Sequence, residues 1–396
     1  MKGVVYLAWR YLAFNRWKTA ILIGAITVIV FLPLALELVL ERSSDQLRAR
    51  AAATPLLFGA PGSPLELALG SLYFSGESPA PLDYATVAEL DDTGLATAIP
   101  LHLGYRVGSQ PVVGTSPDYF RFRGLSVADG RLAVISGETV LGAAAAKMLD
   151  AGPGDGVVTT PESVFDVAGT YPIRLRVVGV LDPTGTPDDQ AVFVDVRTAW
   201  IIGGIGHGHV DLADPQASGG VLKRDESNIV ANAAVVQYRE ITPENMADFH
   251  FHGATDAFPV SAVIADPRDA KSGVLLEGRY QSGDAPVLVV RPAAVIDQLL
   301  ATVLTVRQYV LAAVALVGAA TLATIALVFM LSIRLRRAEI HTMTRIGAAP
   351  GRVAAILGAE IMQVLIASLL LAGLLTGLAA AWGDELFRWL LLSEHR

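Results

Sequence analysis

Three long apolar stretches constrain this chain more than any other feature of its sequence. Residues 20–40, 309–333 and 353–382 are rich in Ala, Val, Leu and Ile. A helix rises 1.5 Å per residue, so stretches of this length can cross a hydrocarbon core of about 30 Å. The second stretch has no charged residue, and Glu360 is the single charge in the third. The sequence therefore predicts three transmembrane helices.

Basic residues indicate which ends of these helices face the cytoplasm. The loop 334–352 holds five arginines and one glutamate, and residues 1–18 hold four basic and no acidic residues. Short segments with such an excess stay in the cytoplasm. We therefore expect residues 1–19 to form a cytoplasmic interfacial helix and residues 41–300 to lie outside the membrane. Residues 383–396 are expected to form an extracytoplasmic amphipathic tail.

A cleaved signal peptide is the competing interpretation of the N-terminus, because a basic start precedes an apolar run. The basic region is long and aromatic, however, and the run 20–40 exceeds the usual signal core of about 7 to 15 residues. The sequence favours a retained transmembrane helix.

The segment 41–300 alternates short β-like runs with helical patterns. We expect residues 41–53 to continue the first apolar helix, residues 55–81 to form a loop, and residues 291–308 to lead unbroken into the second apolar helix. The pattern predicts a helix at 142–149 and strands at 97–107, 138–141, 173–181, 191–194, 229–238, 260–264 and 287–290. The segment is therefore predicted to form an α+β domain with helical stalks.

Composition and missing motifs exclude several functions. The net charge is −8, and because the basic segments lie at the cytoplasmic face, the outer domain is acidic and a poor partner for nucleic acid. The sequence has no Cys, no GxxxxGK[ST] phosphate loop, and no HExxH or GxSxG motif. We therefore expect no enzymatic activity, and the chain itself has no phosphate loop with which to bind a nucleotide.

The basic loop also has a helical pattern. Residues 336–346 contain good helix formers that end before Gly347, and three apolar residues fall at helical spacing: Ile340, Met343 and Ile346. We expect a short amphipathic helix here. On charge alone, a connector that sets the topology explains the segment equally well.

This loop and the helix after it resemble one family. The run RRAEIHTMTRIGAAPGRV is similar to the cytoplasmic loop of FtsX-like (MacB-type) ABC permeases, whose next helix also has an early Glu and spaced Gly. The residues that match are Arg336, Arg337, Glu339, Ile340, Arg345, Gly347, Ala348, Val353, Glu360, Gly373 and Gly377. The resemblance implies that the loop docks on an ATPase. The expected ATPase-coupling residues are Arg336, Arg337, Glu339, Ile340, Met343, Arg345, Ile346 and Gly347.

Three stretches of the outer domain resemble the same family in the same order: 112–131, 138–149 and 175–199. The resemblance implies a mixed fold, in which α-helical transmembrane segments carry an extracytoplasmic α+β domain of the MacB core type. The family has four spans, and we expect that the fourth is lost here, supplied by another chain, or truncated.

The resemblance implies a permease subunit of the bacterial inner membrane. ATP hydrolysis by a partner ABC ATPase would move its periplasmic domain, for export, extraction or metal-linked transport. The expected assembly is a homodimer or pseudo-dimer, with a periplasmic adaptor, lipoprotein or metal-binding protein as a further partner. Two alternatives stay open: a non-transporting regulator of a cell-wall hydrolase, and a membrane-anchored metal-binding or sensing protein.

Two features of the third apolar stretch predict contacts within the membrane. A charge such as Glu360 is costly in lipid unless it faces protein or water, so we expect a polar partner. Gly373 and Gly377 form a GxxxG pattern, which lets two helices approach closely and is also common by chance in such segments.

Histidine is distributed unevenly in the outer domain. Four of the seven histidines form two His-x-His pairs, His207 with His209 and His250 with His252. In an extended segment, side chains two residues apart share a face, and imidazole binds Zn²⁺ and similar ions. If the pairs converge, they would form a metal site, which one of three acidic residues could complete: Asp211, Asp214 or Asp248. The alternative is a solvated loop that binds nothing.

Overall fold

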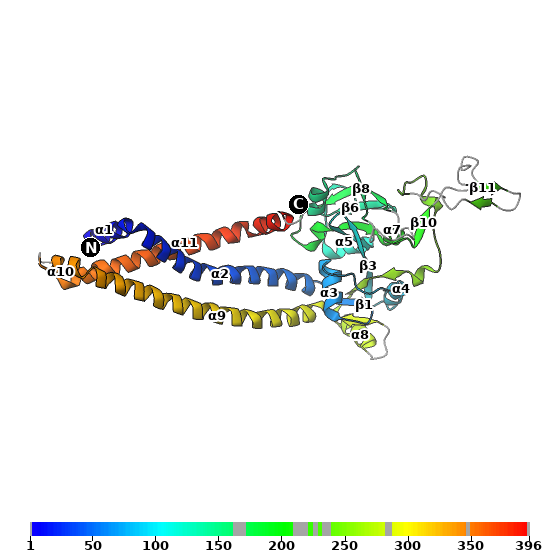
Figure 1. Cartoon of the computed structure of the whole chain (residues 1–396). Coiled ribbons are helices and arrows are strands. Elements are labelled where there is room, and N and C mark those ends of the chain that lie inside the picture. The colour runs from blue at the N-terminus through cyan, green and yellow to red at the C-terminus, as the bar shows by residue number, and fades with distance from the viewer. Residues whose placement is uncertain are drawn as a thin grey trace. The chain divides into compact units, whose positions relative to one another are not determined.

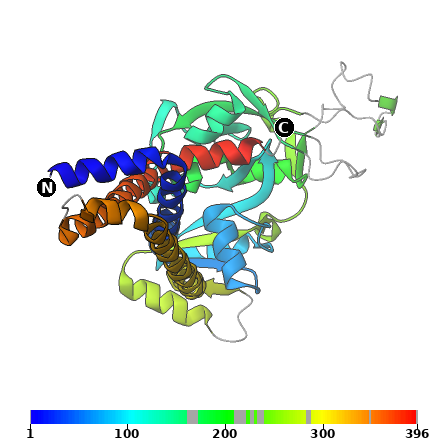
Figure 2. The same ribbon diagram turned by 60° about the vertical axis from the view of Figure 1, so that its left-hand side comes forward.

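The computed structural model describes residues 2–160, 172–208, 221–224, 229–231, 239–281, 287–345 and 349–393. The chain divides into two compact units, Met1–Asp45 with Leu300–Arg396, and Gln46–Leu299 (Figures 1 and 2). Within the described residues, the first unit is helical and the second holds all the strands.

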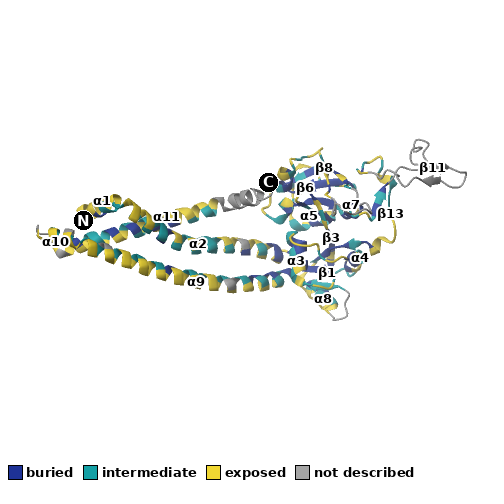
Figure 3. Cartoon of the chain, viewed as in Figure 1, coloured by how far each residue is buried: buried dark blue, intermediate teal, exposed yellow. Residues whose placement is uncertain are grey.

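Five helices contribute to the first unit, and two of them, α2 and α9, also contain residues of the second. They are α1 (Lys2–Phe14), α2 (Arg16–Ala52), α9 (Pro292–Leu335), α10 (Arg337–Arg345) and α11 (Pro350–Ser393). Three stretches of the described chain are long and apolar enough to cross a membrane: Arg16–Ala52, Pro292–Leu335 and Gly351–Ala381. Much of their apolar surface is exposed, as at Leu316 and Leu370 (Figure 3). Such a surface is suited to lipid.

Polar contacts join the long helices of this unit. The Arg307 guanidinium in α9 forms an ion pair with Glu37 in α2. The Thr27 hydroxyl in α2 donates to the Ser368 carbonyl oxygen in α11 at 3.3 Å. In an apolar environment, each such group needs a partner within the protein, so these contacts favour one arrangement of the helices.

Ten strands of the second unit form one mixed sheet. Its order is β16-β1-β15-β3-β4-β9-β6-β8-β5, and β7 also pairs with β8. The β4–β9 and β6–β8 pairs are parallel, and the other pairs of this sheet are antiparallel. The strands are β1 (Leu56–Gly59), β3 (Ala96–Val107), β4 (Gln110–Thr115), β5 (Val127–Gly130), β6 (Glu138–Leu141), β7 (Gly156–Val158), β8 (Arg174–Leu181), β9 (Val192–Asp195), β15 (Ala262–Pro267) and β16 (Leu288–Val290).

Three two-stranded ribbons and several short helices complete the second unit. The ribbons pair β2 (Leu82–Asp83) with β14 (Pro259–Val260), β10 (Gly206–Gly208) with β13 (Phe249–Phe251), and β11 (Val221–Arg224) with β12 (Ile229–Ala231). The α-helices are α3 (Pro64–Tyr73), α4 (Ala85–Asp92), α5 (Pro117–Arg123), α6 (Ala143–Leu149), α7 (Val196–Ile202) and α8 (Ala270–Tyr280). Single 3₁₀ turns are η1 (Pro187–Gln190), η3 (Met246–Asp248) and η4 (Thr255–Ala257).

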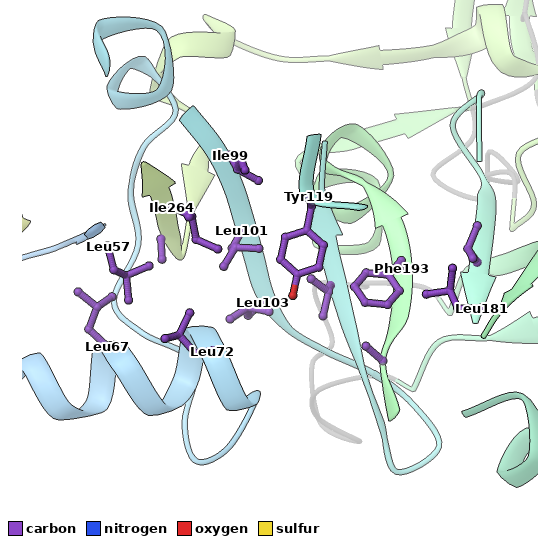
Figure 4. Packing of buried hydrophobic residues seen from close by; sticks show 14 of the residues in the cluster. Leu57, Leu67, Leu72, Ile99, Leu101, Leu103, Tyr119, Leu181, Phe193 and Ile264 are labelled. Atoms are coloured by element: carbon purple, nitrogen blue, oxygen red, sulfur yellow. The ribbon is translucent and has the colours of Figure 1, made fainter. Parts of the chain in front are cut away.

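The sheet buries side chains on both faces, because successive residues of a strand point in opposite directions. In β9, Phe193 packs in the cluster that also holds Tyr119 and Leu101 (Figure 4). Val192 and Val194 of the same strand pack in a different cluster. Helices of the unit cover these apolar surfaces, as α7 does with the buried Ile201, which belongs to the same cluster as Val192 and Val194. The α+β class predicted from the sequence is therefore present.

The stretch 55–81 departs from the prediction of a loop, since it contains β1 and α3. Ser63 caps α3 by accepting the backbone N–H of Glu66 at 3.3 Å, and Pro64 occupies the first turn. Serine followed by proline is a helix-start signal, because proline needs no N–H there. Its position among other Gly and Pro residues concealed that signal.

Other expected elements lie close to the observed ones. The strands at 97–107, 138–141 and 173–181 correspond to β3, β6 and β8, and α9 is one unbroken helix from Pro292 to Leu335. Of the expected strand 229–238, residues 229–231 form β12 and the rest lies outside the described residues. At the C-terminal end, α11 continues to Ser393, past the predicted break at residue 382.

Candidate functional site

Arg336 organises the basic loop from the turn between α9 and α10. Its guanidinium donates to both carboxylate oxygens of Glu360 in α11, at 3.1 Å each. The guanidinium carbon also lies 3.5 Å from the centre of the Tyr11 ring in α1. Arginine forms both contacts at once because its planar group can stack on a ring while its edge binds a carboxylate. Glu360 thus has the polar partner expected from the sequence, and Tyr11 is a contributor that the sequence pattern missed.

The apolar face of α10 points toward its own chain. Ile340 and Met343 are half-buried and line a small pocket with Val353, Ile356 and Leu357 of α11. These side chains hold α10 against the start of α11. That Ile340 and Met343 insert into a partner stays a prediction, and it would require them to leave this pocket.

The opposite face of α10 is exposed and carries positive charge. Arg337 and Arg345 lie on this exposed face, and the last turn of the helix ends with Arg345. The side chain of Glu339 and all of Ile346 and Gly347 lie outside the described residues. Of the expected coupling residues, the structure therefore places two arginines on the surface and three residues, Arg336, Ile340 and Met343, in contacts within the chain.

Gly373 and Gly377 lie on an exposed surface of α11. A Cβ built on either glycine would meet no atom within 4 Å outside the helix. Within the described chain, the GxxxG pattern therefore packs against no other helix, and this surface is open to a partner helix.

A buried ion pair fixes the end of α2 within the second unit. The Arg50 guanidinium donates to Asp188 in η1 at 2.6 and 2.9 Å and to the Tyr119 hydroxyl at 3.0 Å. Both members of the pair are almost fully buried. Burial alone would raise the pKa of Asp188, but the hydrogen bonds and charge of Arg50 lower it below its usual value. The sequence does not indicate this contact because its members are far apart in the chain, although Asp188 lies in a stretch that carries the family resemblance.

The two expected histidine segments meet in the β10–β13 ribbon. His207 of β10 lies directly opposite His250 of β13 in an antiparallel register. His252 follows directly after the end of β13, and the three ring centres are 4.7 to 5.1 Å apart. One ring nitrogen from each of these residues lies within 4.8 Å of the others. Three of the four predicted residues are therefore together, and His209, like Asp211 and Asp214, lies outside the described residues.

The ribbon has an apolar face behind the histidines. Phe249 and Phe251 alternate with His250 and His252 along the chain and pack on the core. A Cβ on Gly206 or Gly208 would lie 2.5 or 2.7 Å from one of these rings. The sequence Gly-His-Gly opposite Phe-His-Phe therefore lets the phenylalanine rings cross the partner strand while the imidazoles point the other way.

Taken together, the apolar helices and the α+β domain define a membrane protein with a domain outside the membrane. The sequence model of the MacB-like periplasmic core domain matches residues 19–234, more than half of the chain. The chain belongs to this family, and its recognition as an FtsX-like, MacB-type permease from the sequence is confirmed. The search of curated proteins gave no match.

Three solved structures show similarity to parts of this chain. The periplasmic region of MacB from Actinobacillus actinomycetemcomitans is 12% identical, with a TM-score of 0.33, and the match covers 63% of this chain and 94% of that one. The extracellular domain of the noncanonic ABC-type transporter YknZ from Gram-positive bacteria is 12% identical, with a TM-score of 0.31 and coverages of 59% and 98%. A domain of a putative permease protein from Porphyromonas gingivalis is 11% identical, with a TM-score of 0.25 and coverages of 53% and 77%.

Proposed function

We propose that this chain is the permease subunit of an FtsX-like ABC system in the cytoplasmic membrane. In this proposal, a partner ATPase binds α10, and its ATP cycle moves the membrane helices and with them the outer domain. The movement of the outer domain serves to export or extract a substrate. The chain acts as a dimer and performs no catalysis itself.

The observation that carries this proposal is the way α10 is attached. Its exposed face offers Arg337 and Arg345 to a partner, while Arg336 at its start binds Glu360 and stacks on Tyr11. A displacement of α10 would therefore pull on α1 and α11 together. It would also pull on α9, because Arg336 is the one residue between the end of α9 and the start of α10. Tight attachment is what a transmitting element needs, because a loose loop would absorb the movement.

The outer domain has a matching attachment at the end of α2. Arg50 is the third residue from the end of this helix, and its guanidinium is held by Asp188 and Tyr119 of the domain. Breaking such a buried pair by removing one partner costs about 3 to 5 kcal/mol. A rotation of the end of α2 would therefore carry the domain with it instead of bending the connection.

Charge reversal on α10 tests the proposal. The chain is purified from its native membrane together with any bound ATPase. The double variant Arg337→Glu, Arg345→Glu should weaken ATPase association roughly tenfold or more, since complementary charge is lost at the contact. Lys147→Glu, on the exposed surface of α6 in the outer domain, is the matched control and should leave association unchanged. Unchanged association in the double variant, or the absence of any ATPase in the purified complex, would overturn the proposal.

A further inference from the structure

The exposed face of the β10–β13 ribbon carries a cluster of imidazoles that the transmission of movement does not use. We propose that His207, His250 and His252 form a binding site for a divalent transition-metal ion of the Zn²⁺ class. This site does not depend on the proposed permease function. It is carried by the geometry of the ribbon.

The spacing of the ring nitrogens fits an ion after a small adjustment. In a tetrahedral zinc site with Zn–N bonds of 2.0 to 2.1 Å, neighbouring nitrogens lie roughly 3.4 Å apart. The nitrogens here lie within 4.8 Å of one another, so each must move by about 1 Å or less. Rotation about the side-chain bonds of the exposed His252 and of the half-buried His207 and His250 provides this movement, and the paired backbone can remain in place.

One imidazole is already oriented as a ligand. The Nδ1–H of His250 donates to the backbone carbonyl oxygen of Asp248 at 3.1 Å. A carbonyl oxygen only accepts, so in the neutral ring this contact favours the tautomer with the proton on Nδ1, and Nε2 is then the nitrogen that can bind an ion. Metal-bound histidines commonly have such a carbonyl or carboxylate on the second ring nitrogen, which sets the orientation of the ring.

The support behind the cluster is rigid. The Phe251 ring lies 6.2 Å from Trp200 and 5.8 Å from Phe258, measured between ring centres, and the Arg197 guanidinium carbon lies 5.2 Å from it. These contacts hold β13 against the core, and the register places His207 opposite His250. A ribbon fixed on one face and carrying three nitrogen donors on the other is organised before any ion arrives.

The donor set selects the class of ion. Neutral imidazole nitrogen binds Zn²⁺, Co²⁺, Ni²⁺ and Cu²⁺, whereas Mg²⁺ and Ca²⁺ require oxygen ligands. Three protein ligands leave a fourth tetrahedral position for water or an incoming group, and such open sites differ from closed structural zinc sites. The chemistry therefore indicates a site at which an ion or its fourth ligand can exchange.

The test uses the full-length protein in detergent, with a purification tag that contains no histidine. After treatment with a chelator, Zn²⁺ is titrated in competition with a chromophoric chelator, and Co²⁺ is added in a parallel sample to record its visible absorption. We expect one ion per chain, with the absorption bands of tetrahedral Co²⁺. His252→Ala should weaken Zn²⁺ binding by at least about tenfold, because the remaining two nitrogens hold the ion poorly.

Two further variants make the result decisive. His341→Ala in α10 removes a histidine outside the cluster and should leave the affinity unchanged. The triple variant of His207, His250 and His252 to Ala should lose the bound ion while circular dichroism remains that of the parent. Since His252 is exposed, its single replacement serves as the test if the triple variant unfolds. Equal Zn²⁺ affinity in the parent and the His252→Ala protein, or no binding by the parent, would overturn the site.

Discussion

Glu138 illustrates, at the scale of one residue, how this protein tolerates a buried charge. Its side chain is 1% exposed, yet it accepts hydrogen bonds from Arg131 and Arg176 and from the backbone N–H of Val134. Burial alone would raise the pKa of this carboxyl, but these donors lower it to about 2. The carboxylate is therefore ionised in the folded domain over the whole physiological range.

A pH dependence of stability follows from this low pKa. The unfolded carboxyl has a pKa near 4.3, so the contribution of Glu138 is complete above that value and is lost as the pH falls toward about 2. Glu138→Gln should lower the free energy of unfolding by about 2 to 4 kcal/mol at pH 7 and reduce the loss of stability between about pH 4.5 and 2. Thermal unfolding of the purified protein, monitored by tryptophan fluorescence at several pH values, measures both the stability at pH 7 and its change with pH.

The control for Glu138 is an exposed ion pair. Asp118 contacts Arg121 on the surface of α5, where solvent screens the attraction. Asp118→Asn should therefore change the unfolding midpoint little. An equal loss of stability in Glu138→Gln and Asp118→Asn at pH 7 would contradict the prediction that the buried carboxylate contributes more than the exposed one.

The pair of Arg336 and Glu360 gives a second prediction at this scale. The Arg336 and Glu360 side chains are 13% and 4% exposed, so removing either one leaves the other as an uncompensated buried charge. In a double-mutant cycle, Arg336→Leu and Glu360→Gln should each destabilise the protein, and the double variant should be less destabilised than their sum by about 1 to 3 kcal/mol. Additive effects on the unfolding midpoint would contradict direct coupling.

At the scale of elements, α11 has a surface that its own chain leaves open. A side chain at Gly373 or Gly377 would meet nothing in the described chain, so Gly373→Leu should leave the fold of one chain intact. If two copies pack through this surface, the added side chain separates their backbones and weakens the dimer. Cross-linking or single-molecule photobleaching in nanodiscs measures the fraction of dimer.

A substitution on the same helix controls for added bulk. Gly358 also has open space around its Cβ position, and it lies in the same helix outside the GxxxG pattern. Gly358→Leu should leave the dimer fraction as in the parent. A dimer fraction unaffected by Gly373→Leu would place the contact between copies elsewhere.

The sequence could predict those elements whose signals are local. Apolar length identified the long helices, and period-two runs identified strands such as β3 and β6 within a residue or two. The start of α3 could not be separated from the loop signals around it. The Arg50 contact could not be predicted either, because 138 residues separate it from Asp188 and sequence periodicity carries no information on such pairs.

The histidine cluster could be predicted only in part from the sequence. Alternation within each segment predicted that His250 and His252 share a face, because this follows from strand geometry alone. Which strand lies opposite depended on the register of β10 with β13. The Gly-His-Gly and Phe-His-Phe segments carried a signal for that pairing, since small residues on one strand leave space for rings on the other.

At the scale of the whole molecule, the absence of cysteine makes the topology directly measurable. We expect a cysteine at Lys147 or Ser393 to react with a membrane-impermeant maleimide on intact spheroplasts, and one at Thr342 in α10 to react only after permeabilisation. Labelling at 147 is the internal control for expression at the surface. Reaction at 393 only after permeabilisation would contradict an outer C-terminal tail.

The strand order of the outer domain has a consequence for how the protein is made. β1 leaves the ribosome early, yet its two neighbours in the sheet, β15 and β16, end at residues 267 and 290. The sheet therefore cannot close at this edge until the segment through Val290 has been synthesised and exported. During that interval β1 and β3 present unpaired edges, which favour wrong pairing between nascent chains. The first strand of the domain to be synthesised is therefore among the last to gain its partners.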